Sequence, residues 1–367
     1  MRTVEVKTEN SDYRIHIGQA VAGAKTCREE LRGLTRNRRC LLITDAHVDK
    51  LYGAGVRASL QTAGAQLVET AVFAPGEKSK TLASANFLYE QAVAAGLDRG
   101  SLIIALGGGV AGDLGGFVAA TYMRGIDYIQ WPTSLLALVD SSVGGKVAVD
   151  LPAGKNLVGA FHQPRLVVAD LQTLATLPEE EFRCGLAEVV KYAMIMDRDF
   201  FDFLRDRPAP IKAREPKTME EVVAHCCRLK AQVVGQDERE GGLREILNYG
   251  HTFGHALEVL AGYGRLTHGA AVALGMAIAV DLAVSLEMAM PEVAENQHEL
   301  LRKFNLPTRL PFAFDPKLAL ETMRHDKKSR NRRLRLILPT AIGQVRPVED
   351  VDEAMILKAM EKRGERG

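Results

Sequence analysis

An apolar run that leads directly into three glycines constrains the fold of this chain more than any other feature. Residues 101–116 read SLIIALGGGVAGDLGG, a strand-like segment followed by glycines and then by apolar residues at helical spacing. Glycine lets the backbone turn sharply, and the free N–H groups at a helix start favour a phosphate. The spacing is not GxGxxG, so the usual dinucleotide fingerprint does not apply, and a tight strand–helix turn without a ligand is the alternative. Asp113, just inside the turn, is either a helix cap or a contact to a polar ligand group.

Further apolar runs alternate with helix-like segments in the first half of the chain. The pattern predicts strands over residues 39–44, 66–73, 101–106, 128–131 and 166–169, and a helix over 81–95. Such alternation is typical of a mostly parallel sheet wrapped by helices. After Pro178 the pattern predicts helices over 181–196, 219–235, 246–261, 269–290 and 291–304, and one late strand over 334–338. We therefore expect an α/β domain over 1–175 and a mostly α-helical domain over 176–367.

Composition excludes several classes of protein. The 367 residues are 47% hydrophobic and 25% charged, with a formal charge of +1, so no global field draws the chain to nucleic acid or an anionic membrane. Five cysteines without a CxxC pair fit a reducing compartment. The first residues lack the apolar core of a secretory signal, and Asp281 interrupts the apolar segment 269–286, which we interpret as a buried helix. The expectation is a cytoplasmic enzyme without nucleic-acid or membrane partners.

A run of small residues between 131 and 160 carries two lysines that each follow a glycine. These are Lys146 and Lys155, and Asp140 and Asn156 lie close by in the sequence. Backbone N–H groups and ammonium groups together suit an anionic ligand. A solvated loop would explain the lysines equally well, although it explains less well why the run has so few other charges.

Histidines in the second half give the strongest local signal. His251 and His255 are four residues apart on a predicted helix, and His268 follows, so that three of the nine histidines lie within 18 residues. Thr252 occupies the position of the catalytic Glu in HExxH proteases, which disfavours that class. Catalytic zinc takes about three protein ligands, and Glu188 and Glu258 are the candidate carboxylates. A single helix histidine is more often only a structural side chain, but the group of three favours a site.

A basic run lies near the C-terminus. Residues 324–335 read RHDKKSRNRRLR and contain seven Lys or Arg. Such a run can bind nucleic acid, but it has no interleaved aromatic residues and the rest of the chain is neutral. We expect a loop that reaches a phosphorylated substrate, or a solvated surface.

Taken together and in order, these stretches resemble the 3-dehydroquinate synthase family of sugar-phosphate cyclases. The matching motifs are PGEKSK (75–80), GGGVAGDLGGF (107–117), YMRGI (122–126), VDSSVGGK (139–146), GKNLVGAF (154–161), GLAEVVKY (185–192), DEREGGLREILNYGHTFGHALE (237–258) and HDKK (325–328). Several motifs in one order are more specific than any one alone. The resemblance implies an N-terminal NAD-binding α/β domain, a helical metal- and substrate-binding domain and a homodimer.

The resemblance also assigns residues to roles. It implies Zn²⁺ or Co²⁺ on Glu188, His251 and His268, with His255 and Glu258 outside the ligand set. It implies NAD contacts at Pro75, Gly76, Glu77, Lys78, Ser79, Lys80, Gly109, Val110, Ala111, Gly112, Asp113, Thr133, Ser134, Lys146, Lys155, Thr173, Leu174, Ala175 and Thr176. It implies substrate contacts at Asp140, Lys146, Asn156, Lys191, Lys230, Arg244, Asn248, His255, Arg124 and one of Lys327 and Lys328. Ala270 stands where the family commonly has Glu, a departure that bears on how His268 is oriented, because hydrogen-bond partners fix the tautomer of a ligating imidazole.

The implied reaction converts 3-deoxy-D-arabino-heptulosonate 7-phosphate into 3-dehydroquinate and phosphate, a step of the shikimate pathway towards aromatic amino acids. NAD is reduced and re-oxidised within one turnover. Three alternatives stay open: a cyclase acting on a sedoheptulose 7-phosphate-type substrate, which lacks the carboxylate that Lys230 and Arg244 would bind; a metal-dependent polyol dehydrogenase, which accumulates NADH; and a non-catalytic nucleotide-binding protein.

Overall fold

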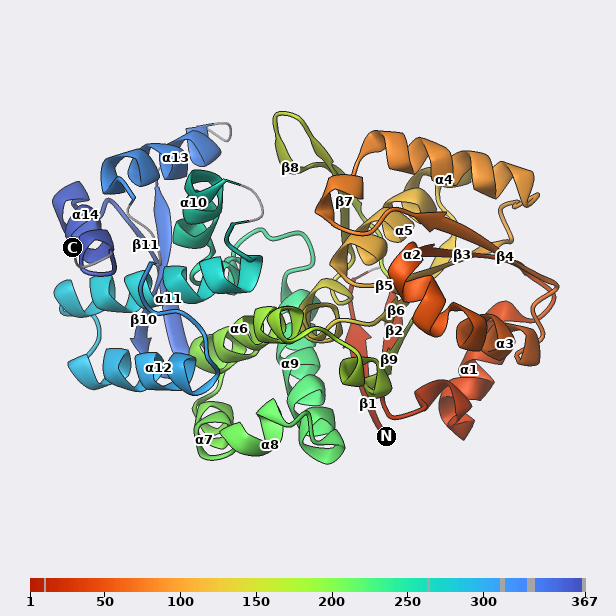
Figure 1. Cartoon of the computed structure of the whole chain (residues 1–367), viewed down its shortest axis with the longest axis horizontal. Coiled ribbons are helices and arrows are strands. Elements are labelled where there is room, and N and C mark those ends of the chain that lie inside the picture. Colours follow the sequence, from red (N-terminus) through yellow and green to blue (C-terminus); the bar gives the residue numbers. More distant parts are fainter. Residues whose placement is uncertain (10, 263–264, 311–313, 329–333, 365–367) are drawn as a thin grey trace. The chain divides into compact units, whose positions relative to one another are not determined.

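The chain divides into two compact units, which are described separately (Figure 1). The computed structural model describes residues 1–9, 11–262, 265–310, 314–328 and 334–364, without the side chains of 325–328. The first unit comprises Met1–Pro178 and Pro216–Arg239, and the second Glu179–Glu215 and Glu240–Gly367. The first cut lies near the predicted boundary at 175/176, but helix α9 (Pro216–Gln236) returns to the first unit because it packs against β1 (Arg2–Lys7) and β2 (Asp12–Gly18). Helical periodicity alone could not reveal that return.

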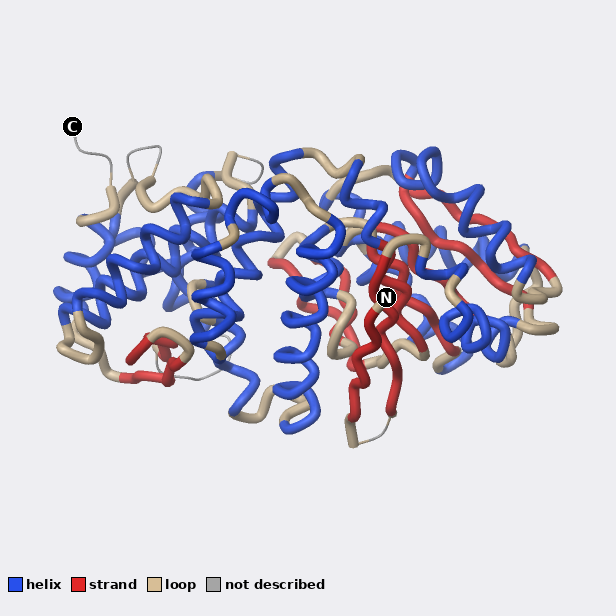
Figure 2. Tube along the Cα trace, turned by 90° about the horizontal axis from the view of Figure 1, so that it is seen from below, coloured by secondary structure: helices blue, strands red, loops and turns tan. Residues whose placement is uncertain are grey.

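A seven-stranded sheet forms the centre of the first unit, in the order β1-β2-β9-β6-β5-β3-β4. All five predicted strands are in it, as β3 (Arg39–Asp45), β4 (Leu67–Phe73), β5 (Leu102–Gly107), β6 (Asp127–Pro132) and β9 (Leu166–Asp170). These strands and β2 run parallel, whereas β1 pairs antiparallel with β2, beside which it runs in Figure 2. The predicted mostly parallel sheet is thus confirmed, with an antiparallel edge strand added.

Alternating side chains of the strands pack against helices on both faces of this sheet. Leu41 and Ile43 of β3 lie in one apolar core with α4 (Leu82–Ala94) and α5 (Gly109–Thr121). Cys40 and Leu42 lie in the opposite core with α1 (Lys25–Thr35) and α3 (Ala54–Thr62). Figure 1 shows α1 and α3 on the other side of the sheet from α4. Burial on both faces explains why the strands read as continuous apolar runs. The remaining elements of this unit are η1 (Val21–Gly23), α2 (Ala46–Val48), η2 (Asp49–Gly53), η3 (Glu77–Ser79), η4 (Tyr122–Arg124), η5 (Ala137–Ser141), η6 (Leu171–Ala175) and the hairpin β7 (Lys146–Leu151)–β8 (Gly154–Phe161).

Helix α11 (His268–Ser285) is the core helix of the second unit and packs against α6, α10, α12, α14 and β10. By length and composition it could cross a membrane, but 78% of its apolar window is buried inside the structure, as expected for a core helix. It ends at Ser285, and Glu287 beyond it has a φ of +56°, so the prediction that the helix continues to 290 is wrong. The elements around it are α6 (Glu179–Met196), α7 (Arg198–Asp206), α8 (Pro208–Lys212), η7 (Leu243–Asn248), α10 (His251–Ala261), α12 (Pro291–Lys303), α13 (Pro316–Lys328), β10 (Arg335–Ala341), β11 (Gln344–Glu349) and α14 (Glu353–Glu361).

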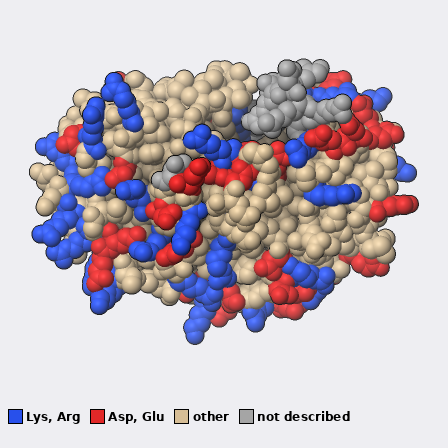
Figure 3. Space-filling model, turned by 180° about the vertical axis from the view of Figure 1, so that it is seen from behind, with Lys and Arg blue, Asp and Glu red and all other residues tan. Residues whose placement is uncertain are grey.

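Charges of both signs are mixed on the face shown in Figure 3, in keeping with the formal charge of +1. All five cysteines are buried free thiols.

Candidate functional site

Three helices of the second unit each contribute one of the predicted cation ligands. Glu188 lies in the middle of α6 and is fully buried, and His251 and His268 are the first residues of α10 and α11. Gly250 makes the turn into α10. Its φ is +78°, and a Cβ there would lie 2.8 Å from the Val272 carbonyl oxygen, so the turn requires glycine. This turn is also why α10 begins at 251 and not at the predicted 246.

The three side chains converge. Oε1 of Glu188 lies 3.5 Å from Nε2 of His251 and 3.4 Å from Nε2 of His268. All three ligand atoms lie within 4.8 Å of one another. Tetrahedral zinc ligands at about 2.0–2.2 Å from the ion are about 3.3–3.5 Å apart, so two edges of the triad already have the spacing that a cation requires. One carboxylate and two imidazoles are also a donor set that Zn²⁺ and Co²⁺ accept.

Each ligand is held from behind by a second group. Nδ1 of His251 donates to the Tyr249 carbonyl oxygen at 3.1 Å, and Nδ1 of His268 lies 3.4 Å from Oε2 of Glu258. The Lys191 ammonium lies 2.5 Å from Oε2 of Glu188, the oxygen that does not face the imidazoles. Such contacts fix the tautomer and direction of metal ligands. In both histidines Nε2 is thereby turned towards Glu188.

Burial and charge act differently on the two imidazoles. Burial lowers the pKa of His251 to about 3, although Glu188 opposes the shift, so this ring is neutral as a ligand must be. Burial also disfavours the charged form of His268, but the hydrogen bonds that its ring donates to Glu188 and Glu258 outweigh this and raise the pKa to about 10. In the cation-free protein one positive charge thus lies between two carboxylates. A bound cation would replace the charged His268 ring as the positive group between these carboxylates.

Close helix packing at glycines brings these ligands together. A Cβ on Gly275 of α11 would lie 1.9 Å from the Gly250 carbonyl oxygen, and one on Gly254 of α10 would lie 2.9 Å from the Ala271 carbonyl oxygen. Gly269, next to His268, approaches Cys184 of α6 so closely that a Cβ would lie 2.4 Å from the Cys184 Cα. Gly269 N also donates to Cys184 Sγ at 3.1 Å. The lack of a side chain at these glycines therefore allows the close spacing of the three helices.

Three other predicted substrate residues of the second unit lie close to His251 in the sequence. Arg244 is buried in η7, and Nδ2 of Asn248 donates to Oε1 of Glu240 at 3.1 Å. His255 is exposed, and its ring centre is 5.5 Å from that of His251 and 6.1 Å from that of His268. Lys327 and Lys328 belong to α13, but their side chains lie outside the described residues.

In the first unit, the buried Lys80 is the centre of a polar cluster. Its ammonium forms an ion pair with Asp113 of α5 and donates to Oδ1 of Asn156 at 2.5 Å. Burial disfavours the charged form of Lys80, but Asp113 outweighs it and raises the pKa of Lys80, whereas burial raises the pKa of Asp113. Asn156 has a φ of +58°, and its N–H donates to Oδ1 of Asp150 at 2.8 Å. Three motifs far apart in sequence thus meet at one lysine.

Lys230 of α9 also belongs to the first unit, not to the predicted second domain. Its ammonium donates to the Asp140 carbonyl oxygen at 2.8 Å and forms an ion pair with the Asp140 carboxylate. Lys146 opens β7 and is exposed. The return of α9 to the first unit therefore brings together two of the predicted substrate contacts.

The glycine-rich turn joins β5 to α5, as the sequence indicates. Gly107 has a φ of +150°, and Gly109, Val110, Ala111 and Gly112 form the first turn of α5, which has no side-chain cap. The N–H of Thr133, after β6, donates to the Gly107 carbonyl oxygen at 2.9 Å, and Ser134 Oγ accepts from Ala137 N at 3.2 Å. The turns after two neighbouring parallel strands lie together at one edge of the sheet, where ligands of such folds bind.

The remaining predicted NAD contacts lie in two further turns of the same unit. Pro75, Gly76, Glu77, Lys78 and Ser79 follow β4, and Nζ of Lys155 lies 3.7 Å from Oε1 of Glu77. Thr173, Leu174, Ala175 and Thr176 follow β9. The hydroxyl of Tyr52 donates to the Thr173 carbonyl oxygen at 3.3 Å, a contact that the sequence did not suggest.

Arg124 lies in a left-handed stretch of backbone. The φ angles are +51° at Met123, +69° at Arg124 and +112° at Gly125. Such a conformation is costly for residues other than glycine and is often kept for function. The side chains of Met123 and Arg124 are exposed.

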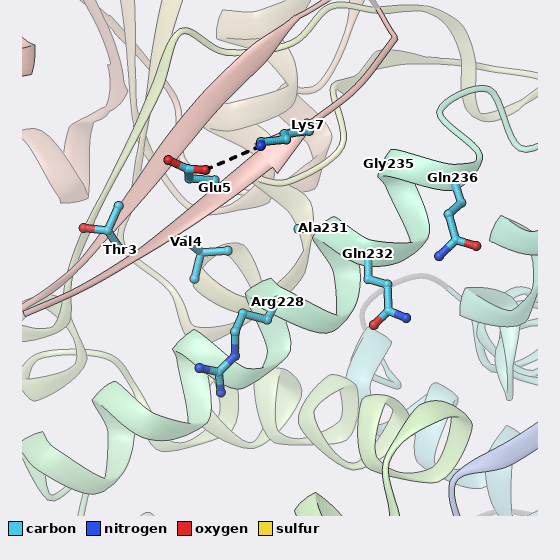
Figure 4. A pocket seen from close by; sticks show the side chains of 9 residues that line it. All are labelled: Thr3, Val4, Glu5, Lys7, Arg228, Ala231, Gln232, Gly235 and Gln236. Carbon is cyan, nitrogen blue, oxygen red and sulfur yellow. Dashed lines mark ion pairs between the residues drawn. The ribbon is translucent and has the colours of Figure 1, made fainter.

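A groove of about 450 Å³ lies elsewhere in the first unit, between β1 and α9 (Figure 4). Arg228, Gln232 and Gln236 line it from the helix, and Glu5 and Lys7 from the strand. No predicted site residue lines it. It is therefore separate from the candidate site.

Comparisons with known proteins agree with these features. Residues 70–184 match the model of the 3-dehydroquinate synthase N-terminal family, and residues 185–329 match that of the 3-dehydroquinate synthase C-terminal family. Two curated relatives have the name 3-dehydroquinate synthase. The one from Desulforamulus reducens is 47% identical, over 98% of this chain and 99% of its own length, and the one from Symbiobacterium thermophilum is 49% identical, over 90% and 92%.

Solved structures show the same fold over nearly the whole chain. One is 2-deoxy-scyllo-inosose synthase complexed with carbaglucose-6-phosphate, NAD⁺ and Co²⁺, with a TM-score of 0.87, 28% identity and coverage of 99% of this chain and 100% of that one. Another is a 2-epi-5-epi-valiolone synthase from Streptomyces hygroscopicus with NAD⁺ and Zn²⁺ bound, with a TM-score of 0.87, 27% identity and 99% coverage of both chains. Glycerol dehydrogenase from Schizosaccharomyces pombe, at 17% identity, a TM-score of 0.65 and coverage of 95% of this chain and 88% of that one, shares the fold alone.

Proposed function

Because this chain belongs to the 3-dehydroquinate synthase family, we propose that it converts 3-deoxy-D-arabino-heptulosonate 7-phosphate into 3-dehydroquinate and phosphate. The observation that carries the proposal is the triad of Glu188, His251 and His268, whose ligand atoms lie within 4.8 Å of one another. A cation held by these residues would lower the pKa of a substrate hydroxyl that is to be oxidised. The shikimate pathway is then the place of the enzyme in metabolism.

The proposed cofactors are NAD and either Zn²⁺ or Co²⁺, as in the two cyclase structures. Bound NAD would accept and return one hydride, and a bound cation would polarise the hydroxyl that is oxidised. The triad is preorganised, since Lys191 and Tyr249 fix the directions of Glu188 and His251. For NAD we propose the turns after the strands of the first unit, around Gly109, Asp113 and Lys80.

The substrate is proposed to be recognised by its two anionic groups. Lys230 and Arg244 would bind the carboxylate, for which a guanidinium gives a two-point contact. Asp140 keeps the Lys230 ammonium in place through the contacts described above. Lys146, Asn156, His255 and one of Lys327 and Lys328 would bind the phosphate and stabilise it as it leaves.

Two other functions fit the same fold. A cyclase for a substrate without a carboxylate would have no use for both Lys230 and Arg244, and both are present. A polyol dehydrogenase finds support only in fold similarity at 17% identity, far below the 47–49% of the curated relatives. Both observations favour the heptulosonate as substrate.

We also propose a cytoplasmic homodimer without nucleic-acid or membrane partners. We propose that Arg124 contacts the substrate phosphate, in its own subunit or across the dimer interface. Its exposed side chain and the costly left-handed backbone at Met123 and Arg124 support this role. The dimer and the location stay predictions.

The test measures phosphate release by the full chain with NAD⁺ and Zn²⁺ or Co²⁺. We expect phosphate from the heptulosonate but not from sedoheptulose 7-phosphate, no net gain of NADH absorbance, loss of activity with a chelator and recovery with added cation. Net NADH formation would instead identify a dehydrogenase. Turnover of sedoheptulose 7-phosphate alone would identify the other cyclase.

A further inference from the structure

The ring of His268 lies between two carboxylates. Its Nε2 is 3.4 Å from Oε1 of Glu188, and its Nδ1 is 3.4 Å from Oε2 of Glu258. An imidazole that gives the lone pair of Nε2 to a cation carries its proton on Nδ1. That proton then points at Glu258, which is the contact that a ligating histidine normally makes with a carboxylate.

We propose that Glu258 is a positioning residue of the cation site, which fixes the tautomer and ring direction of His268. The inference rests on the proposed function only in taking the triad of Glu188, His251 and His268 as a cation site. Ala270, at the position where the resemblance suggests a Glu, has only a methyl group to offer His268. The carboxylate that contacts His268 in this chain comes from α10.

The packing of α10 against α11 keeps Glu258 in this position. Glu258 is 9% exposed and lies two helical turns after His251, on the same face of α10. The glycine contacts between the two helices, at Gly254 and Gly275, hold their backbones closer than side chains would allow. The main chains that carry Glu258 and His268 are therefore held close to each other.

Of the two histidines of the triad, His268 is the one whose direction depends on a replaceable side chain. The ring of His251 is held by the main-chain oxygen of Tyr249, which no substitution removes. Cation affinity should therefore respond to Glu258 in a graded way. An amide keeps one acceptor oxygen without the charge, and alanine keeps neither.

A different role for Glu258 has to be distinguished. His255, Glu258 and His268 also have ligand atoms within 4.8 Å of one another, so Glu258 could itself be a ligand of a second cation. The two groups share His268, and the group with Glu188 is the more buried one. This favours orientation of His268 over ligation as the role of Glu258.

The experiment compares the full chain with its Glu258→Gln and Glu258→Ala variants. Affinity for Co²⁺ is measured by competition with a chelator, together with the visible spectrum and the number of Co²⁺ ions bound. NAD⁺ affinity checks the first unit. Asp281→Asn is the matched control, because Asp281 is another buried carboxylate on a histidine of the same unit, 3.1 Å from Nε2 of His298.

We expect Glu258→Ala to lower Co²⁺ affinity about 10- to 100-fold and to change the spectrum. Glu258→Gln should lose less, and Asp281→Asn should keep the affinity although it unfolds at a lower temperature. NAD⁺ affinity should stay unchanged throughout. Unchanged Co²⁺ affinity in Glu258→Ala would overturn the inference. It would also be overturned if the wild type binds two Co²⁺ ions and Glu258→Ala loses only the weaker one. A wild-type chain that binds no Co²⁺ would instead contradict the proposed function.

Discussion

At the scale of single residues, the two oxygens of Glu188 have different partners. Oε1 faces the imidazoles of His251 and His268, and Oε2 faces the Lys191 ammonium. The residue is fully buried, so its charge is balanced by these neighbours and not by water. One carboxylate would therefore serve both the proposed cation site and the stability of α6.

Glu188→Gln should affect both properties. We expect cation affinity to fall by more than about 100-fold, since a ligand matters more than a group behind it. The free energy of unfolding should fall by about 3–5 kcal/mol, because the buried Lys191 loses its carboxylate. Chelator competition and urea unfolding measure the two effects. Glu180→Gln, on the exposed first turn of the same helix, is the control and should change neither; a Glu188→Gln variant that keeps its affinity would remove Glu188 from the ligand set.

Sequence reasoning reached the residue types of the cation site but not the groups behind them. Three histidines within 18 residues predicted a site, and the resemblance named Glu188, His251 and His268. The contact of His251 with a main-chain oxygen leaves no trace in residue identity. Glu258 was visible as a candidate carboxylate, but its place behind His268 depends on the distance between two helices.

At the scale of elements, the α10–α11 contact is determined by positions without side chains. Gly275→Ala would place a Cβ 1.9 Å from the Gly250 carbonyl oxygen, on rigid main chain. We expect a loss of about 1–3 kcal/mol in the free energy of unfolding and weaker cation binding, because the helices that carry His251 and His268 must separate. Gly55→Ala in α3 is the matched control, with no atom within 4 Å of the added Cβ. It should be neutral or slightly stabilising, and equal effects of the two substitutions in urea unfolding would contradict this account.

A second buried cluster attaches the C-terminal helix to the core of the second unit. Arg363, just after α14, donates to Oδ2 of Asp281 at 2.5 Å, and His298 of α12 contacts Oδ1. Burial alone would raise the pKa of Asp281, but hydrogen bonds from His298 and Arg363 outweigh it and hold that pKa well below its ordinary range. Three helices thus meet at one carboxylate.

Arg363→Met should lower the free energy of unfolding by about 3–5 kcal/mol at neutral pH, because it leaves Asp281 buried without its strongest cation. The sign with pH follows from the lowered pKa. The contribution is complete above the unfolded pKa of about 4 and is lost as the pH falls below it. Urea unfolding from pH 7 to pH 3 should show a smaller decrease in the variant than in the wild type. Parallel curves would mean that Arg363 does not set this pKa.

Element types were more predictable than element ends. The sequence predicts five of the six parallel strands, because burial on both faces leaves apolar runs in most of them, but it does not predict β2, in which apolar and polar residues alternate. The sequence predicts no strand at the hairpin β7–β8 and suits either an anionic ligand or a solvated loop there, since the second strand is largely exposed and lacks an apolar pattern. The start of α10 and the end of α11 depend on local backbone angles, at Gly250 and Glu287, which helical periodicity does not report.

At the scale of the whole molecule, the chain passes between the units three times, at 178/179, 215/216 and 239/240. A fragment of residues 1–175, the predicted domain, would lack α9 and uncover the surfaces of β1 and β2 that this helix packs against. We expect it to aggregate, whereas residues 1–178 joined to 216–239 by a flexible glycine–serine linker should fold and bind NAD⁺. Sedimentation and calorimetry test both fragments. NAD⁺ binding by a monomeric 1–175 fragment would contradict the division.

The last prediction uses both proposed ligands on the intact chain. A ligand that binds only the folded state adds about 2.7 kcal/mol at a concentration of 100 times its Kd. Each ligand should therefore raise the Tm by about 5–10 °C for a unit of this size. Because His251 belongs to the second unit and the proposed NAD contacts to the first, His251→Ala should abolish the shift with Co²⁺ and keep the shift with NAD⁺. Lys80→Ala should do the reverse, since it removes the cation that Asp113 and Asn156 share. Differential scanning fluorimetry measures the four Tm shifts of the two variants with the two ligands. A variant that loses both Tm shifts would contradict the assignment of the two ligands to separate units.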